Sequence, residues 1–247
     1  MDLAAVDERL AGLLCEQEQA RAERILDDRA RPLWMRSRGV LRALLGRYLQ
    51  RDPGTLRFSL GAHGKPALLG GGPAFNLSHS GTLAVYAISA SGEVGVDVQL
   101  ARRRIDEAAI ARRFLAAADA QRLAQLPAPE RRAEFLRAWV RHEATLKCRG
   151  TGFGGDGGAG AEGAAGAGGA GAEGVGGAGA AGVGSAGAAG AAGAGAEGAA
   201  VETGAADPAD AERMKRALWL ADVDVGRGAA AAVASEEDPR DLRCWAW

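Results

Sequence analysis

The apolar residues between positions 33 and 49 recur every three or four residues, which is the period of an α-helix. The sequence Arg-Asp-Pro-Gly follows at 51–54 and is typical of a helix end. We therefore predict a helix over residues 31–50. Its apolar face consists of Leu33, Trp34, Val40, Leu41, Leu44, Leu45, Tyr48 and Leu49.

The next fifty residues favour strands. Residues 56–68 predict two short extended pieces around the Gly-Lys-Pro sequence at 64–66. Residues 82–89 and 94–100 are rich in strand-forming side chains, and the segment between them, Ala-Ser-Gly-Glu, predicts a turn. We expect these two strands to form a hairpin.

The second half repeats this plan. Residues 105–126 and 129–150 each predict an amphipathic helix, and Pro-Ala-Pro at 127–129 separates the two. Residues 217–225 and 229–235 predict a second hairpin around Gly-Arg-Gly, and 242–247 a final strand. The pattern indicates an α+β fold with two related subdomains, 1–100 and 101–247.

One segment interrupts the second half. Residues 154–200 are almost entirely glycine and alanine, which offer little apolar surface and cost much backbone entropy to order. We expect a disordered insertion at about 154–205.

Composition excludes several classes of protein. The chain has 30 basic and 31 acidic residues, so an anion site must be local rather than spread over the surface. The three cysteines are far apart and do not indicate a disulfide framework. The first residues are acidic where a signal peptide would be basic, and no apolar run is long enough to span a membrane. We expect a soluble cytoplasmic protein.

Two carboxylates occupy positions where apolar residues are expected. In the strand 94–100, alternation places Asp97 and Gln99 on the face opposite the valines, with Gly95 leaving room beside them. In the helix 129–150, the apolar stripe continues onto Glu143 and Lys147. Two alternatives stay open here: a sheet face turned to water, and a surface Glu-Lys pair one turn apart.

Basic residues gather on the first predicted helix. Arg38 and Arg42 are one turn apart and could grip one phosphate together. The alternative is a solvated arginine face. The arginines of this group are Arg31, Arg36, Arg38, Arg42 and Arg47, with Lys65 downstream.

Three ordered motifs resemble the 4′-phosphopantetheinyl transferases of the monomeric, surfactin-synthetase-activating (Sfp) type. They are FNLSHSG at 75–81, GVDVQL at 95–100 and FLRAWVRHEATLKCRGTGF at 135–153. The resemblance implies a pseudo-dimer of two α+β halves, each with helices packed on a small antiparallel sheet. It also implies Mg²⁺-dependent transfer of the phosphopantetheine arm of coenzyme A to a serine of an apo acyl or peptidyl carrier protein.

The resemblance also implies roles for individual residues. Asp97 and Glu143 would hold Mg²⁺, with Gln99 as a weak or water-mediated third ligand. Glu143 would in addition act as the base toward the carrier serine, and Lys147 would hold the transferred phosphate. The coenzyme A contacts would be Arg38, Lys65, Ser78, His79 and, less directly, Arg31. A cytoplasmic monomer that serves secondary-metabolite carriers, without nucleic acid or membrane, is expected.

Two departures from the family pattern leave alternatives open. Gln99 stands where many relatives have a third carboxylate, and His142 replaces a lysine. A degenerate member that binds coenzyme A or a carrier without catalysis is therefore one alternative. A nucleic-acid-binding protein that uses the arginines is another, although interleaved aromatic residues are missing.

Overall fold

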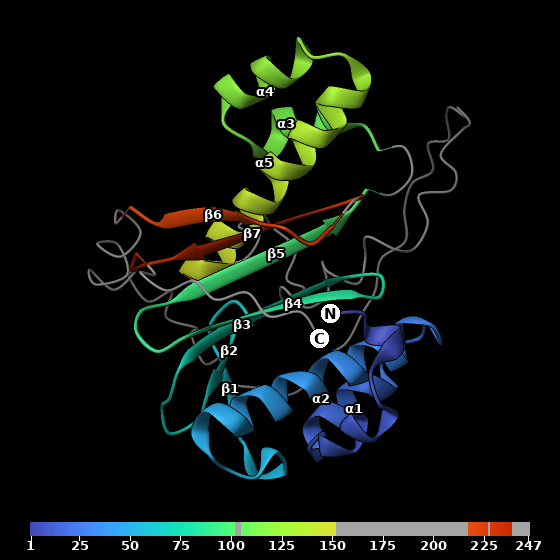
Figure 1. The fold of residues 1–247 in the computed structure, drawn as a ribbon, viewed down its shortest axis with the longest axis vertical. Coiled ribbons are helices and arrows are strands. Elements are labelled where there is room, and N and C mark those ends of the chain that lie inside the picture. The colour runs from blue at the N-terminus through green and yellow to red at the C-terminus, as the bar shows by residue number, and fades with distance from the viewer. Residues whose placement is uncertain (102–104, 152–216, 227, 239–247) are drawn as a thin grey trace, which may run out of the picture. The chain divides into compact units, whose positions relative to one another are not determined.

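The computed structural model describes residues 1–101, 105–151, 217–226 and 228–238. These residues form helices, 3₁₀ turns and three small sheets (Figure 1), and all of them fall within one compact unit. The Gly/Ala-rich insertion, the predicted strand 242–247 and Phe153 lie outside the described residues. The 3₁₀ turns are η1 (Leu3–Ala5), η2 (Glu8–Leu13) and η3 (Pro53–Thr55); the helices are α1 (Glu16–Glu23), α2 (Ala30–Leu49), α3 (Glu107–Phe114), α4 (Ala117–Ala124) and α5 (Ala128–Arg149).

The described strands pair in antiparallel fashion throughout. They form the sheets β1-β2, β3-β4 and β5-β7-β6. Their bounds are β1 (Phe58–Leu60), β2 (Pro66–Leu68), β3 (Ala74–Ser80), β4 (Leu83–Ser89), β5 (Val94–Leu100), β6 (Trp219–Val223) and β7 (Ala229–Ser235). The combination of helices with small antiparallel sheets confirms the α+β class. The pseudo-dimer and its division at residue 100 stay predictions.

The predicted helix at 31–50 is confirmed as α2. Its apolar face buries Leu41 and Leu45 against Leu56 and Phe75. The helix ends at Gln50, which has a φ of 51°, in the left-handed conformation common at helix C-termini. The short strands β1 and β2 and the hairpin β6-β7 are also confirmed.

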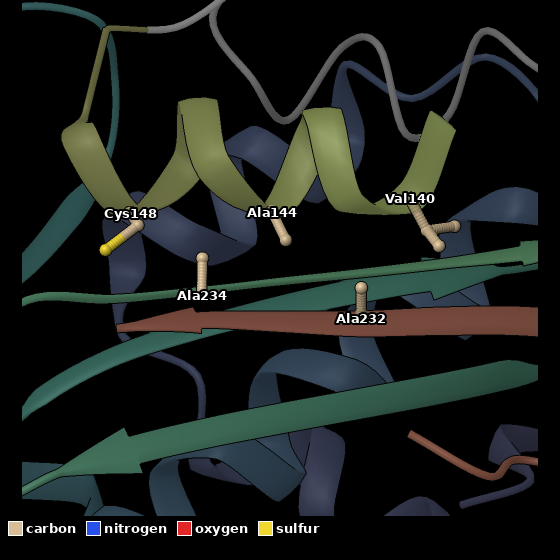
Figure 2. Close-up of a cluster of buried hydrophobic side chains, with 5 residues drawn as sticks. All are labelled: Val140, Ala144, Cys148, Ala232 and Ala234. Carbon is tan, nitrogen blue, oxygen red and sulfur yellow. The ribbon is translucent and has the colours of Figure 1, made fainter. Parts of the chain in front are cut away.

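Helix α5 confirms the second long prediction and covers one face of the β5-β7-β6 sheet. Figure 2 shows Val140, Ala144 and Cys148 directed at Ala232 and Ala234 of β7. The helix begins after a proline and ends at Gly150, whose φ is 69°. Small alanines on the strand permit this close packing, which places the last three turns of α5 directly on the sheet.

Two predictions about local structure were wrong. The segment 105–126 forms two helices rather than one, because Leu115 and Ala116 are extended and α4 folds back so that Ala111 and Leu123 both pack on Phe135 of α5. The expected hairpin of residues 82–89 with 94–100 does not form either. Strand β4 pairs with β3, and β5 pairs with β7.

Strand β3 was not predicted, although it carries the FNLSHS sequence. Gly81, with a φ of 59°, and Thr82 connect it to β4 in a two-residue turn. Phe75 joins the core beneath α2. The alternate positions Asn76, Ser78 and Ser80 are polar yet buried, which hid the strand from a search for apolar alternation.

Candidate active site

Asp97 lies in the middle of β5, on the face that α5 covers. Its partner in the sheet register is Ala232, one of the alanines beneath the helix. The residue is only 2% exposed. The alternative of a polar sheet face turned to water is therefore wrong, and a buried carboxylate of this kind requires charged or hydrogen-bonding partners.

Gly95 allows the helix to approach the strand this closely. A Cβ atom on Gly95 would lie 2.2 Å from both the Ala144 oxygen and the Cys148 nitrogen. Gly95 does leave space beside Asp97, as expected, but the backbone of α5 fills that space. The glycine thus sets the distance between β5, which carries Asp97, and α5, which carries Glu143 and Lys147.

Lys147 and Ser78 both bind one oxygen of Asp97. The Lys147 ammonium donates to Asp97 Oδ1 at 2.6 Å, and the Ser78 hydroxyl donates to the same oxygen at 2.8 Å. Lys147 also donates to Ser78 Oγ at 3.1 Å. The alternative of a surface pair of Glu143 with Lys147 is wrong, since the lysine is directed at Asp97 on the strand.

Two buried carboxylate oxygens lack a hydrogen-bond partner within the described residues. They are Asp97 Oδ2 and Glu143 Oε1. Burial, reinforced by the nearby Asp97 and opposed by Lys147, raises the pKa of Glu143 to about 7. Two oxygens that are buried, unpaired and electrostatically coupled fit a shared divalent cation, because Mg²⁺ in phosphate-binding sites takes one or two carboxylates and leaves its other positions to phosphates and water.

Gln99 continues this face of β5 and is half-buried. Its sheet partner, Ala230, contributes no polar atom from its side chain. Within the part of the chain that the structure describes, no three His, Cys, Asp or Glu side chains come together as a metal site. The candidate protein ligands are therefore the Asp97 carboxylate and the Gln99 amide from this face of β5, and the Glu143 carboxylate from α5.

His79 is close enough to feel the charges of both Lys147 and Arg38. Burial lowers the pKa of His79, and the charges of Lys147 and Arg38 lower it further. Burial also lowers the pKa of Arg38 to about 10, so the guanidinium is still charged at neutral pH. Arg38 lies 5.3 Å from the centre of the Trp34 ring, and His79 Nδ1 has no hydrogen-bond partner among the described residues.

Two of the residues expected to contact coenzyme A, Lys65 and Arg31, are bound to other protein groups in the structure. Lys65 donates to Glu93 Oε2 and to the carbonyl oxygens of Val94 and Cys148, which uses all three hydrogens of its ammonium. Arg31 binds the Ile25 carbonyl with two nitrogens and lies 3.7 Å from Asp28.

The possible joint grip of Arg38 and Arg42 on one anion, one of the two alternatives left open, does not form in the structure. Arg42 is fully buried, pairs with Glu18 at 2.6 Å and donates to the carbonyl oxygens of Pro53 and Leu56. Its guanidinium holds α1 and the 53–56 turn against α2.

His142 is half-buried beside Trp139, and burial lowers its pKa. Tyr86 was missed by the sequence reasoning. Its hydroxyl donates to the Ser37 carbonyl at 3.0 Å, and burial raises its pKa while the nearby Arg38 opposes that rise. The apolar segment 82–89 gave no signal for this hydrogen bond, because tyrosine fits any strand.

Comparison with known proteins agrees with the motifs. Residues 93–160 match the family model described as the 4′-phosphopantetheinyl transferase superfamily. The chain resembles the 4′-phosphopantetheinyl transferases. The matched segment contains Asp97, Gln99, Glu143 and Lys147, whereas Ser78, His79 and Arg38 precede it.

Individual transferases show the same similarity. The chain is 36% identical over 147 residues to the 4′-phosphopantetheinyl transferase HetI of Nostoc sp., which covers 58% of this chain and 62% of the relative. A putative 4′-phosphopantetheinyl transferase of Synechocystis sp. is 36% identical over 146 residues, 58% of this chain and 59% of the relative. AcpT of Salmonella typhi is 38% identical over 111 residues, 44% of this chain and 56% of the relative. The chain thus matches about 60% of the length of the first two transferases.

Proposed function

We propose that this chain is a 4′-phosphopantetheinyl transferase that uses coenzyme A and Mg²⁺ to modify a serine of an apo carrier protein. The observation that carries this proposal is a pair of buried oxygens, Asp97 Oδ2 and Glu143 Oε1, which have no hydrogen-bond partner among the described residues and belong to side chains near Lys147. The similarity to transferases over residues 93–160 supports the reaction class.

Asp97 and Glu143 would hold the divalent cation, and Gln99 would reach it at most with its amide oxygen or through water. When bound to the diphosphate of coenzyme A, the cation would neutralise charge that develops on the leaving oxygen. Asp97 is suited to this task because Ser78 and Lys147 already fix its other oxygen.

Phosphate groups of coenzyme A would meet Lys147, His79 and Arg38. Lys147 would hold the transferred phosphate, and the charged Arg38 would bind the 3′-phosphate. A neutral His79 can donate one hydrogen bond to a phosphate oxygen. For Lys65 to reach the adenine end, it must give up at least one of its three protein acceptors, so we rank it, with Arg31, below these three.

In the reaction, the hydroxyl oxygen of the carrier serine forms a bond to the phosphorus next to pantetheine. The bond from that phosphorus to the bridging oxygen breaks, and adenosine 3′,5′-bisphosphate leaves. The serine proton must go to a base, and the resemblance makes Glu143 the candidate for that role.

The remaining parts of the proposal rest on the resemblance. They are a monomer and a carrier from a secondary-metabolite pathway; a cytoplasmic location is proposed from the three widely spaced cysteines. Among the described residues no helix is both long and apolar enough to cross a membrane.

The test is a mass measurement. Protein, Mg²⁺, coenzyme A and an apo carrier are mixed, and the carrier should gain the mass of one phosphopantetheine group. Asp97→Ala should lower the rate of transfer by more than the roughly 10–100-fold loss that is typical when a residue that only orients a metal ligand is replaced. Asp222→Ala is the matched control, because Asp222 pairs with Arg141 on the surface of the same sheet. Coenzyme A binding without any mass gain would favour the non-catalytic alternative.

A further inference from the structure

Three polar side chains of β3 bind the free edge of β5. The backbone N–H groups of Val96, Val98 and Leu100 donate to Asn76 Oδ1, Ser78 Oγ and Ser80 Oγ, at 2.8, 3.4 and 3.1 Å respectively. The three acceptors are spaced by two residues, as are the three donors. We call this set of bonds the side-chain ladder; it joins the β3-β4 hairpin to β5 without backbone pairing.

The middle bond of the side-chain ladder differs from its neighbours. Besides accepting from Val98, the Ser78 hydroxyl donates to Asp97 Oδ1 and accepts from Lys147 Nζ. The contact with Val98 is long, whereas the bonds to Asp97 and from Lys147, at 2.8 and 3.1 Å, lie within the normal range. Ser78 is also only 2% exposed. The single hydrogen of this hydroxyl and its shorter accepted bond are thus both directed at residues of the proposed cation site.

From these contacts we propose that Ser78 is a positioning residue for the cation site, rather than a direct contact of coenzyme A. This inference rests on the proposed function. Ser78 and Lys147 both occupy Oδ1 of Asp97, so the carboxylate cannot rotate freely and Oδ2 is left as its ligand oxygen. Partners of this kind orient metal ligands, and their loss typically weakens metal binding by roughly 10–100-fold.

Ser80 provides the matched control. Ser80→Ala and Ser78→Ala each remove one acceptor of the side-chain ladder, but only Ser78 touches Asp97 and Lys147. A purely structural role would therefore affect both variants alike. Folding of each variant is checked by circular dichroism and thermal unfolding. Ser78→Cys serves as a second variant, because its thiol has a similar shape but is a weak donor and acceptor.

The experiment measures two affinities of the full chain. The first is the Kd of Mn²⁺ at saturating coenzyme A, by electron paramagnetic resonance. Ser78→Ala and Ser78→Cys should weaken it by about tenfold or more, and Ser80→Ala by roughly twofold at most, since no partner of a ligand is lost there. The second is the Kd of coenzyme A in EDTA, by calorimetry, which Ser78→Ala should leave unchanged.

Two results would overturn the inference while leaving the proposed function intact. One is an equal loss of Mn²⁺ affinity in the Ser78 and Ser80 variants, which would mean that Ser78 only holds the strands together. The other is weaker coenzyme A binding in EDTA with unchanged Mn²⁺ affinity, which would mean a direct contact. If the unaltered protein binds neither Mn²⁺ nor coenzyme A, the proposed function and the inference both fail.

Discussion

Lys147 on α5 donates a 2.6 Å hydrogen bond to Asp97 on β5, and this ion pair lies almost wholly inside the protein. A buried carboxylate and a buried ammonium each have a large cost of desolvation, which their mutual attraction offsets only when both are present. The pair therefore links the stability of the fold to the geometry of the proposed cation site.

Replacing Lys147 should destabilise the protein. Lys147→Met leaves Asp97 buried without its counter-charge, and the expected loss is about 3 kcal/mol of unfolding free energy, in line with other broken buried pairs. Urea denaturation in EDTA measures this loss. Asp97→Asn combined with Lys147→Met is the control: the double variant should be more stable than Lys147→Met alone, and strictly additive losses would contradict the pairing.

The raised pKa of Glu143 predicts a pH dependence of stability in the absence of divalent cations. The folded pKa is about 7, against an ordinary value of 4.5. Between these values the folded state keeps a proton that the unfolded state releases, so the unfolding free energy should fall as pH rises, by roughly 3 kcal/mol in total. Glu143→Gln should lack this component and be the more stable protein above pH 7. Parallel pH profiles from pH 5 to 8 for the two proteins would speak against a raised pKa.

Gly95→Ala should force the strand and helix apart. The new Cβ would meet backbone atoms of Ala144 and Cys148 at 2.2 Å, and neither can move without shifting α5. Overpacking of this kind costs about 1–3 kcal/mol, and we expect Mn²⁺ affinity to fall as well, because Glu143 moves with the helix. Gly12→Ala is the control, since nothing lies within 4 Å of its Cβ. Similar melting temperatures for the two variants would contradict the close approach.

Gln99→Glu should strengthen cation binding. The variant places a third carboxylate near the cation, on the same face of β5 as Asp97. The Mg²⁺ concentration for half-maximal transfer should therefore fall by roughly tenfold. This is a modest effect for one added charge at an effective dielectric constant near 20. Titration of the transfer rate with Mg²⁺ tests this. An unchanged or higher concentration would place Gln99 away from the ion.

Much of the fold could be predicted from local patterns. The periodic apolar residues of α2 and α5 and the strands of β6-β7 need only neighbouring residues to be recognised. The pairing of β5 with β7 could not be predicted in this way, because Asp97 and Ala232 are brought together by burial beneath α5 rather than by a turn. The break between α3 and α4 likewise depends on packing against Phe135.

The same distinction between local patterns and long-range contacts applies to the candidate site. Asp97 and Glu143 could be proposed because each is a charge beside apolar positions and each falls in a motif that resembles the transferases. The residues that pair with these charges could not be predicted from the sequence. Lys147 is directed at Asp97 rather than at Glu143 one turn away, and Lys65 is bound to carbonyl oxygens of β5 and α5. Such choices among several possible partners depend on distances that only the folded chain defines.

The proposed function depends on one divalent cation shared by Asp97 and Glu143. Anomalous diffraction from crystals grown with Mn²⁺ and coenzyme A would locate this ion. We expect a peak between Asp97 Oδ2 and Glu143 Oε1, about 2.0–2.3 Å from each, the spacing of Mg²⁺-type sites. A coenzyme A complex with manganese bound elsewhere, or with these two oxygens turned away from a common ion, would contradict it.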